Sequence, residues 1–126
     1  MIPLSVPCIE GNEWKYVKEC LDTGWISSAG SYVNKFEDKI AEIVGAKYGV
    51  ACVNGTSGLH IAQIISGVQY NDYVIAPNLT FVATINSIKY CGADPILIDA
   101  ESSNWQMDLD LLEEYLINNT EQKKNR

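Results

Sequence analysis

The stretch Val53-Asn54-Gly55-Thr56-Ser57-Gly58-Leu59-His60 joins an apolar segment to a helical pattern through a run of small residues. The segment before it, Tyr48–Val53, is short and continuously apolar, which is typical of a parallel strand covered on both faces. Behind it, Leu59–Ser66 carries apolar residues at helical spacing, and Thr56 and Ser57 open the helix. The stretch therefore predicts a strand-to-helix turn in an α/β fold.

The sequence that follows repeats this alternation of strand and helix. Strands are predicted at Tyr73–Ala76 and Pro95–Ile98, with a helix from Thr80 to about Tyr90 between them. Together with Tyr48–Val53 this gives a βαβαβ order, for which right-handed crossovers are expected. A further helix is predicted at Asp108–Leu116, with its acidic residues near the positive end of the helix dipole.

The residues before the first predicted strand indicate helices. Apolar residues recur at helical spacing in Asn12–Leu21 and again in Val33–Val44. Gly24 and Gly45 follow where a left-handed C-cap is expected. After Asn118 the composition becomes polar, so we expect a structured part at 1–118 and a polar tail at 119–126.

Composition and charge limit the classes of function. The chain has 126 residues, 47% of them apolar, with 9 basic and 16 acidic side chains and a net charge of −7. This acidity disfavours nucleic acid as a partner. Neither a signal peptide nor an apolar run of roughly 20 residues is present, so a cytoplasmic protein without a membrane span is expected. The spacing of the four cysteines matches neither a zinc site nor a CxxC pair, which indicates reduced thiols.

The small residues of the quoted stretch suit the binding of a phosphate. They allow a ligand to approach the backbone, and the first-turn amides, the helix dipole and the hydroxyls of Thr56 and Ser57 attract an anion. The alternative is a tight connection with a Ser/Thr N-cap and no ligand. The stretch is not GxGxxG, and it lacks the lysine of a P-loop.

Other polar or aromatic residues follow the later strands at the same carboxyl edge. Phe81 either presents its ring to an aromatic ligand or belongs to the core. Asp99 and Glu101 form either an acid–base pair or, with Asp99 as a cap, part of the loop towards Asp108. His60 is the single histidine, which disfavours histidine metal clusters and Ser-His-Asp chemistry and favours a packing role.

Taken as an ordered set, the motifs resemble the first third of a DegT/DnrJ/StrS-type sugar aminotransferase. These are pyridoxal-phosphate enzymes of the aspartate aminotransferase fold type that act on keto sugars attached to nucleotides. The resemblance implies the βαβαβ portion of the large domain, with a mostly parallel sheet and flanking helices. The motifs that carry it are Ile2–Ser5, Gly24–Gly30, Val53–His60, Thr80–Thr84 and Gly92–Asp99.

The resemblance also implies roles for individual residues. Gly55, Thr56 and Ser57 would hold the phosphate of pyridoxal 5'-phosphate, and Phe81 would stack on its ring. Gly58 stands where the family usually has alanine. The implied partners are a nucleotide sugar, an amino donor such as glutamate, and a second copy of the enzyme in a homodimer. For substrate binding it implies the loop residues Trp25, Ile26, Ser27 and Ser28.

The resemblance further implies that catalytic residues are missing from this chain. In the family, the aspartate that pairs with the pyridine nitrogen and the lysine that forms the Schiff base come later in the sequence. The family's strand order also separates the first strand from the second and third, so Tyr48–Val53 would lack a neighbour. We therefore expect an N-terminal part of a larger enzyme that is inactive alone. The alternatives are a non-catalytic domain that binds a phosphate-bearing ligand, or a protein-interaction module with exposed strand edges.

Overall fold

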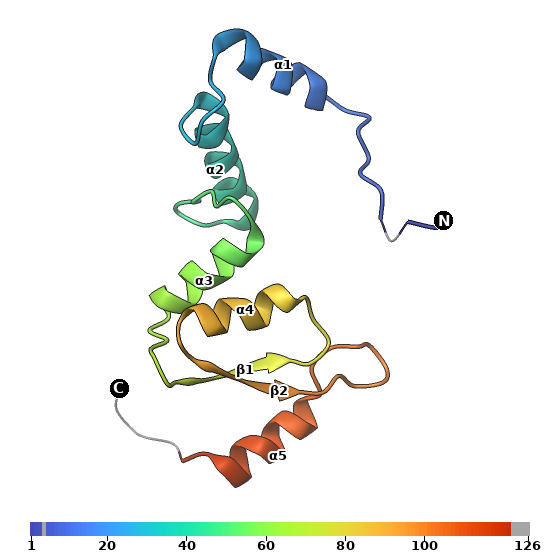
Figure 1. Cartoon of the computed structure of the whole chain (residues 1–126), viewed down its shortest axis with the longest axis vertical. Coiled ribbons are helices and arrows are strands. Elements are labelled where there is room, and N and C mark those ends of the chain that lie inside the picture. Colours follow the sequence, from blue (N-terminus) through green and yellow to red (C-terminus); the bar gives the residue numbers. More distant parts are fainter. Residues whose placement is uncertain (4, 122–126) are drawn as a thin grey trace. The chain divides into compact units, whose positions relative to one another are not determined.

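The chain folds into helices and a small sheet, shown as a computed structural model in Figure 1. The structure describes residues 1–3 and 5–121, so Leu4 of the Ile2–Ser5 motif and residues 122–126 of the predicted polar tail lie outside the described residues. The chain divides into two compact units, Met1–Ala51 and Cys52–Arg126.

The first unit consists of helices α1 (Glu13–Thr23) and α2 (Ser31–Val44) with their connecting loop. Both helices were predicted from apolar spacing. Gly24 and Gly45 end them in the left-handed region, with φ of 73° and 68°, which confirms the predicted C-caps. A single residue of these two helices, Ala41, is buried within this unit.

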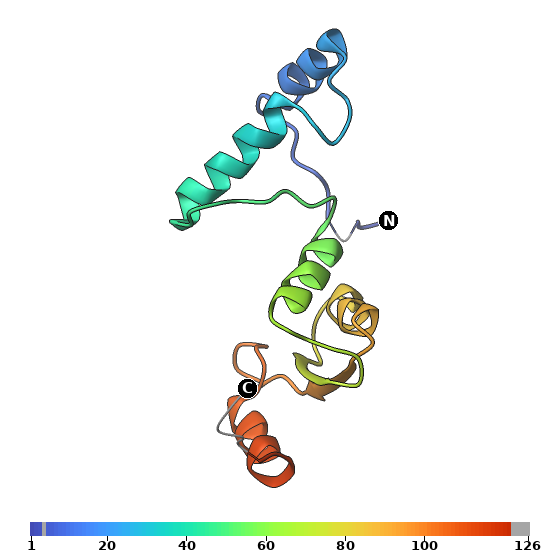
Figure 2. The ribbon, with the colours of Figure 1, turned by 90° about the vertical axis from the view of Figure 1, so that its left-hand side faces the viewer.

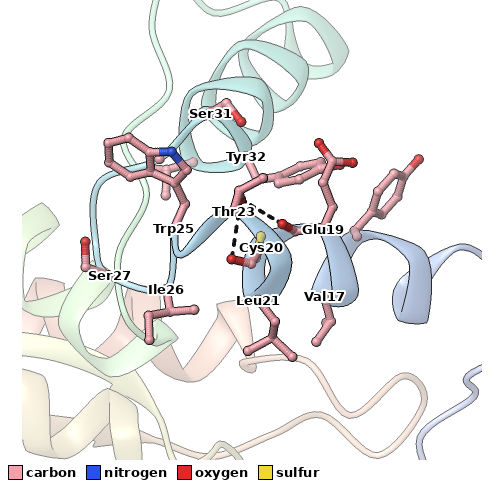
Figure 3. A pocket seen from close by; sticks show the side chains of 13 residues that line it. Val17, Glu19, Cys20, Leu21, Thr23, Trp25, Ile26, Ser27, Ser31 and Tyr32 are labelled. Carbon is pink, nitrogen blue, oxygen red and sulfur yellow. Dashed lines mark hydrogen bonds between the residues drawn. The ribbon is translucent and has the colours of Figure 1, made fainter.

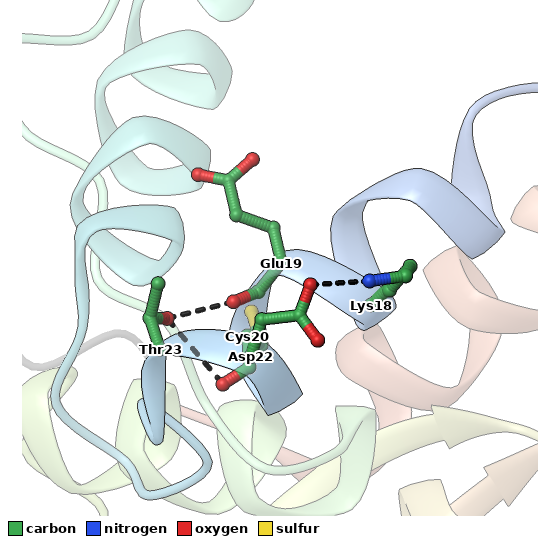
Figure 4. Close-up of polar contacts among 5 residues, drawn as sticks. All are labelled: Lys18, Glu19, Cys20, Asp22 and Thr23. Atoms are coloured by element: carbon green, nitrogen blue, oxygen red, sulfur yellow. Dashed lines mark hydrogen bonds and ion pairs between the residues drawn. The ribbon is translucent and has the colours of Figure 1, made fainter.

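Local polar contacts hold the end of α1, as Figure 4 shows. The hydroxyl of Thr23 donates to the carbonyl oxygens of Glu19 at 2.7 Å and Cys20 at 3.4 Å, and Cys20 is among the last four residues of the helix, whose carbonyls have no helical partner. Lys18 and Asp22 form an ion pair one helical turn apart. These contacts fix the point at which the chain leaves α1 for the Trp25–Gly30 loop.

The second unit contains α3 (Gly55–Ile65), β1 (Tyr73–Pro77), α4 (Val82–Tyr90), β2 (Asp94–Ile98) and α5 (Leu109–Asn119). The two strands are parallel, and Tyr73 pairs with Asp94. Helix α4 covers one face of this sheet, and in Figures 1 and 2 α5 lies on the other side. The core cluster lies under α4. It consists of Ala76, Ile88 and Ala93, with Val68, Val74, Ile85 and Cys91 packed against it.

The prediction of a strand at Tyr48–Val53 is wrong for this structure, because no strand lies there and the sheet consists of β1 and β2. The segment instead follows α2. The amide of Ala51 donates to the Glu37 carboxylate at 2.8 Å, and a Cβ added at Gly49 would lie 2.5 Å from the Glu37 carbonyl oxygen. A strand pairs its backbone groups with another strand, and among the described residues the sheet consists of β1 and β2, so no strand is paired with this segment.

Replacing Gly58 by alanine is expected to stabilise the chain by about 0.5–1 kcal/mol, because glycine weakens a helix interior and an added Cβ meets nothing within 4 Å. Gly67→Ala is the matched control. Its Cβ is equally free of contacts, but its φ of 88° costs a non-glycine residue roughly 1–2 kcal/mol. Urea unfolding followed by circular dichroism should show opposite shifts of the midpoint, and shifts of one sign would contradict this reading.

Candidate functional site

The N-terminus of α3 is built by Asn54 and not by the predicted Ser/Thr cap. Asn54 is extended, with φ −163° and ψ 170°, and its side-chain oxygen accepts from the amide of Ser57 at 2.9 Å. The helix begins at Gly55, so Thr56 and Ser57 lie in its first turn. Among the described residues neither hydroxyl takes part in a hydrogen bond, and both remain available to a ligand.

The first turn of α3 presents backbone amides as well as hydroxyls. The first helical hydrogen bond at this end joins the Gly58 amide to the Asn54 carbonyl at 3.2 Å, which leaves the Gly55 and Thr56 amides without a partner inside the helix. A Cβ added at Gly55 would meet nothing within 4 Å, so no other described atom crowds the chain at this residue. Two amides and two hydroxyls at the positive end of a helix dipole fit a phosphate group.

Phe81 lies at the N-terminus of the next helix, α4. Its backbone is extended, with φ −66° and ψ 144°, and it is the N-cap residue. Its side chain is 84% exposed, so the alternative that Phe81 belongs to the core does not hold in this structure. The ring is thus available to contact a ligand at the carboxyl side of β1.

A cavity of about 510 Å³ lies at the carboxyl ends of β1 and β2, where ligands bind in open α/β sheets. The contacts of Asp99 there are with the backbone of its own loop. Its carboxylate accepts from the amide of Ala100 at 2.9 Å, and its carbonyl accepts from the amide of Asp108 at 2.8 Å, which supports the loop-capping interpretation. The cavity is lined by Asn78, Leu79, Asp99, Ala100, Glu101, Ser102 and Trp105.

Trp105 is the aromatic residue of this cavity, and the sequence did not mark it as a site residue. Its φ is 63°, a conformation that costs energy for a side chain of this size. The Glu101 amide donates to the carbonyl of Gln106 at 2.9 Å, and the Trp105 amide donates to the carbonyl of Glu101 at 3.1 Å. These bonds close the loop that places Trp105 at the cavity. No local sequence signal marks the position, because the conformation depends on how the loop closes.

The first unit contains a separate pocket of about 460 Å³ (Figure 3). Of the predicted substrate-binding residues, Trp25, Ile26 and Ser27 line this pocket and Ser28 does not. Trp25 and Ile26 are 60% and 74% exposed. The structure therefore brings three residues of the predicted loop into one apolar pocket. The other lining residues are Tyr16, Val17, Glu19, Cys20, Leu21, Thr23, Gly30, Ser31, Tyr32 and Val33.

One hydrogen bond in this pocket raises the pKa of a tyrosine, Tyr32. The hydroxyl of Tyr32 donates to the Glu19 carboxylate at 2.7 Å, and this hydrogen bond is the main cause that raises the pKa of Tyr32 from 10.0 to about 12. The Tyr32 ring also lies 5.2 Å from that of Tyr16, centroid to centroid, and the Lys35 ammonium lies 4.7 Å from its centre. The contact joins α1 to α2 across the pocket wall.

We expect Tyr32 to titrate well above an ordinary tyrosine, and Glu19→Gln to bring its pKa back towards 10.0. Since the folded-state pKa is raised, the contribution of this contact to stability is fully present below the unfolded value and is lost as pH rises through about 12. Ring-carbon chemical shifts of tyrosine measured against pH check this. A Tyr32 pKa near 10.0 in the unchanged chain would contradict the contact.

The sequence profile of the DegT/DnrJ/EryC1/StrS aminotransferase family matches residues 7–123. The chain belongs to this aminotransferase family. GDP-perosamine synthase of Escherichia coli O157:H7 is 44% identical over 119 residues, which is 94% of this chain and 33% of that protein. GDP-perosamine synthase of Vibrio cholerae is 40% identical over 87% of this chain and 30% of its own length. The chain thus spans about a third of the length of these family members.

Solved structures of aminotransferases confirm the expected α/β fold of a pyridoxal-phosphate transferase. Spr1654 of Streptococcus pneumoniae, described as a sugar aminotransferase, matches with a TM-score of 0.80 and 30% identity over 90% of this chain and 29% of its own. It has been solved in PLP, PMP and apo forms, where PLP is pyridoxal phosphate and PMP its pyridoxamine form. An aminotransferase of Psychrobacter cryohalolentis matches with a TM-score of 0.79 and 27% identity over 89% of this chain and 29% of that one.

The described residues contain neither a cluster of metal ligands nor a helix that could span a membrane. No group of three or more histidine, cysteine or acidic side chains in 1–3 and 5–121 is arranged to hold a metal ion. Over the same residues, no helix is long and apolar enough to cross a membrane. His60 contacts Tyr90 edge to face, with ring centres 5.6 Å apart, which confirms its packing role.

Proposed function

We propose that this chain supplies the cofactor-phosphate and ring contacts of a pyridoxal-phosphate-dependent aminotransferase that acts on a keto sugar attached to a nucleotide. The observation that carries the proposal is the first turn of α3. Two of its amides have no partner inside the helix, its two hydroxyls take part in no hydrogen bond among the described residues, and a Cβ at Gly55 would meet no atom within 4 Å. This turn lies inside the region that the aminotransferase family profile matches.

The residues of the second unit would bind and orient the cofactor. The Gly55 and Thr56 amides donate to phosphate oxygens, and the hydroxyls of Thr56 and Ser57 are further, uncharged hydrogen-bond donors. The exposed ring of Phe81 covers one face of the pyridine and excludes water from it. When bound, pyridoxal phosphate supplies an electron sink for the amino-acid chemistry.

We assign substrate contact to the loop Trp25, Ile26, Ser27 and Ser28. Support comes from the pocket that Trp25, Ile26 and Ser27 line, because an indole ring and several hydroxyl groups lie in its wall. Aromatic and hydroxyl side chains suit a sugar nucleotide, because they offer a stacking face and hydrogen-bond partners. The names of the perosamine synthases agree with a nucleotide-sugar substrate.

The remaining assignments follow the family resemblance. We infer that glutamate is the amino donor, that two copies form a homodimer, and that the enzyme works in the cytoplasm in the synthesis of surface polysaccharide. The acidic pI near 4.5 supports the expectation that nucleic acid is not a partner. These assignments stand on the relatives and on composition.

The chain by itself is proposed to lack transaminase activity. A transaminase uses one lysine amine both to hold the cofactor and to move a proton. The Lys89 ammonium is paired with the Asp94 carboxylate at 2.5 Å, and the Lys47 ammonium lies 5.1 Å from the centre of the Tyr48 ring. Lys123 and Lys124 lie outside the described residues.

Amide chemical shifts measured during titration with pyridoxal phosphate test the proposal. We expect the Gly55 and Thr56 amides and the Phe81 ring to respond together and to saturate with one dissociation constant. Inorganic phosphate should move the amides and leave Phe81 unmoved. A response of the amides to both ligands without any response of Phe81 would favour the non-catalytic phosphate-binding alternative. No response from α3 would contradict the proposal.

A further inference from the structure

Helix α3 is attached to the rest of its unit in an unusual way. None of its residues is buried, and none belongs to the core cluster under α4 or to the apolar side chains packed against that cluster. Yet α3 packs on α4, as Figures 1 and 2 show. The helix that carries the proposed phosphate site is therefore not fixed by burial in the core.

Polar side chains make the specific contacts between these two helices. The side-chain amide of Gln63 in α3 donates to the hydroxyl of Ser87 in α4 at 3.1 Å. Ser87 is fully buried, with an exposed fraction of 0%, and its own hydroxyl donates to the Thr84 carbonyl at 2.8 Å. The thiol of Cys91 lies 3.7 Å from the Gln63 carbonyl oxygen as its donor. Both ends of the Gln63 amide are thus held, one by Ser87 of α4 and the other by Cys91, the C-cap residue of that helix.

This contact connects the two halves of the proposed cofactor site. The phosphate-binding turn begins α3, and Phe81 caps the N-terminus of α4. At 1.5 Å per residue, Gln63 lies about 12 Å along α3 from Gly55, and Ser87 lies about 9 Å from Phe81. A change of about 10° in the crossing of the helices would therefore move the first turn of α3 by about 2 Å.

We propose that Gln63 and Ser87 are positioning residues that set the phosphate-binding turn of α3 at a fixed place relative to Phe81. Hydrogen bonds are directional, so the Gln63–Ser87 bond selects one crossing angle where apolar contact alone would tolerate several. The inference rests on the proposed function, because it concerns a ligand that touches both helices. It adds two residues that contact neither the phosphate nor the ring.

A comparison of two ligands tests this positioning role in the full 126-residue chain. Pyridoxal phosphate spans α3 and α4, whereas inorganic phosphate contacts α3 alone. In Gln63→Leu and in Ser87→Ala, we expect the dissociation constant for pyridoxal phosphate to rise roughly tenfold, the effect of about one hydrogen bond. The dissociation constant for inorganic phosphate should change less than about twofold, since the first turn itself is intact.

Two further variants separate positioning from stability. The double variant Gln63→Leu/Ser87→Ala removes both partners of the Gln63–Ser87 bond and leaves only the weakly donating Cys91 thiol without its acceptor, so its unfolding midpoint should recover towards that of the unchanged chain. Its affinity for pyridoxal phosphate should remain low. Val74→Ala destabilises the core without touching the contact between α3 and α4, and it should leave both affinities within about twofold.

Each outcome decides the inference. Equal loss of affinity for both ligands, or recovery of pyridoxal phosphate binding in the double variant, would show a merely structural role and overturn it. Unchanged affinities in both single variants would overturn it while the proposed function stands. If neither ligand shifts the amides of α3 in the unchanged chain, the proposed function fails, and the inference fails with it.

Discussion

Replacing Gly55 by proline is expected to weaken pyridoxal phosphate binding roughly 10- to 100-fold, because a hydrogen bond to a charged group contributes about 1.5–3 kcal/mol and proline has no amide to donate. The helix should survive the change. Gly55 is the first residue of α3, where proline is well tolerated, and Asn54 before it is already extended, as the residue before a proline must be.

Gly55→Ala is the matched control for this change. It keeps the amide, and its Cβ meets nothing within 4 Å in the chain. Affinity measured by titration of the cofactor absorbance should order the proteins as unchanged chain, Gly55→Ala and then Gly55→Pro, with equal helix content by circular dichroism. Equal affinities for the proline and alanine variants would contradict a role for the Gly55 amide.

Replacing Phe81 by alanine should weaken binding of the cofactor by roughly 1–3 kcal/mol, or about 5- to 150-fold, through loss of the apolar and stacking contact with the ring. Stability should hardly change, because Phe81 is 84% exposed and is not part of the buried core cluster. Binding of inorganic phosphate should be unaffected, since Phe81 lies on α4 and the phosphate on α3.

Val82→Ala is the control for Phe81→Ala. Val82 is the neighbouring residue, begins α4 and is 69% exposed. It loses apolar surface at the same helix end without removing an aromatic ring. A similar loss of affinity in both variants would contradict stacking, and a large loss of stability in Phe81→Ala would restore the core interpretation.

The sequence predicted those features that depend on neighbouring residues. The glycines at 24 and 45 end their helices as expected, because a left-handed C-cap is a local preference. The strands β1 and β2 were predicted as Tyr73–Ala76 and Pro95–Ile98, one residue shorter than each is in the structure, because each is short and apolar and a helix separates them. The fold class followed from this alternation.

Features that depend on distant residues could not be read in this way. Tyr48–Val53 has the composition of a strand, but a strand forms only beside another, and here Glu37 of α2 binds Ala51 instead. The sequence assigned the N-cap of α3 to Thr56 and Ser57, whereas in the structure the Asn54 side chain caps the helix by accepting from the Ser57 amide. The Gln63–Ser87 contact joins residues that are 24 positions apart, and no local sequence pattern near either residue predicts it.

The most direct test of the central claim is reduction of the purified chain with borohydride in the presence of pyridoxal phosphate, followed by mapping of labelled lysines. We expect reversible binding through the first turn of α3, no stoichiometric label on any lysine, and no amino transfer from glutamate to a keto sugar nucleotide. One stoichiometric label on a single lysine, together with that transfer, would contradict it.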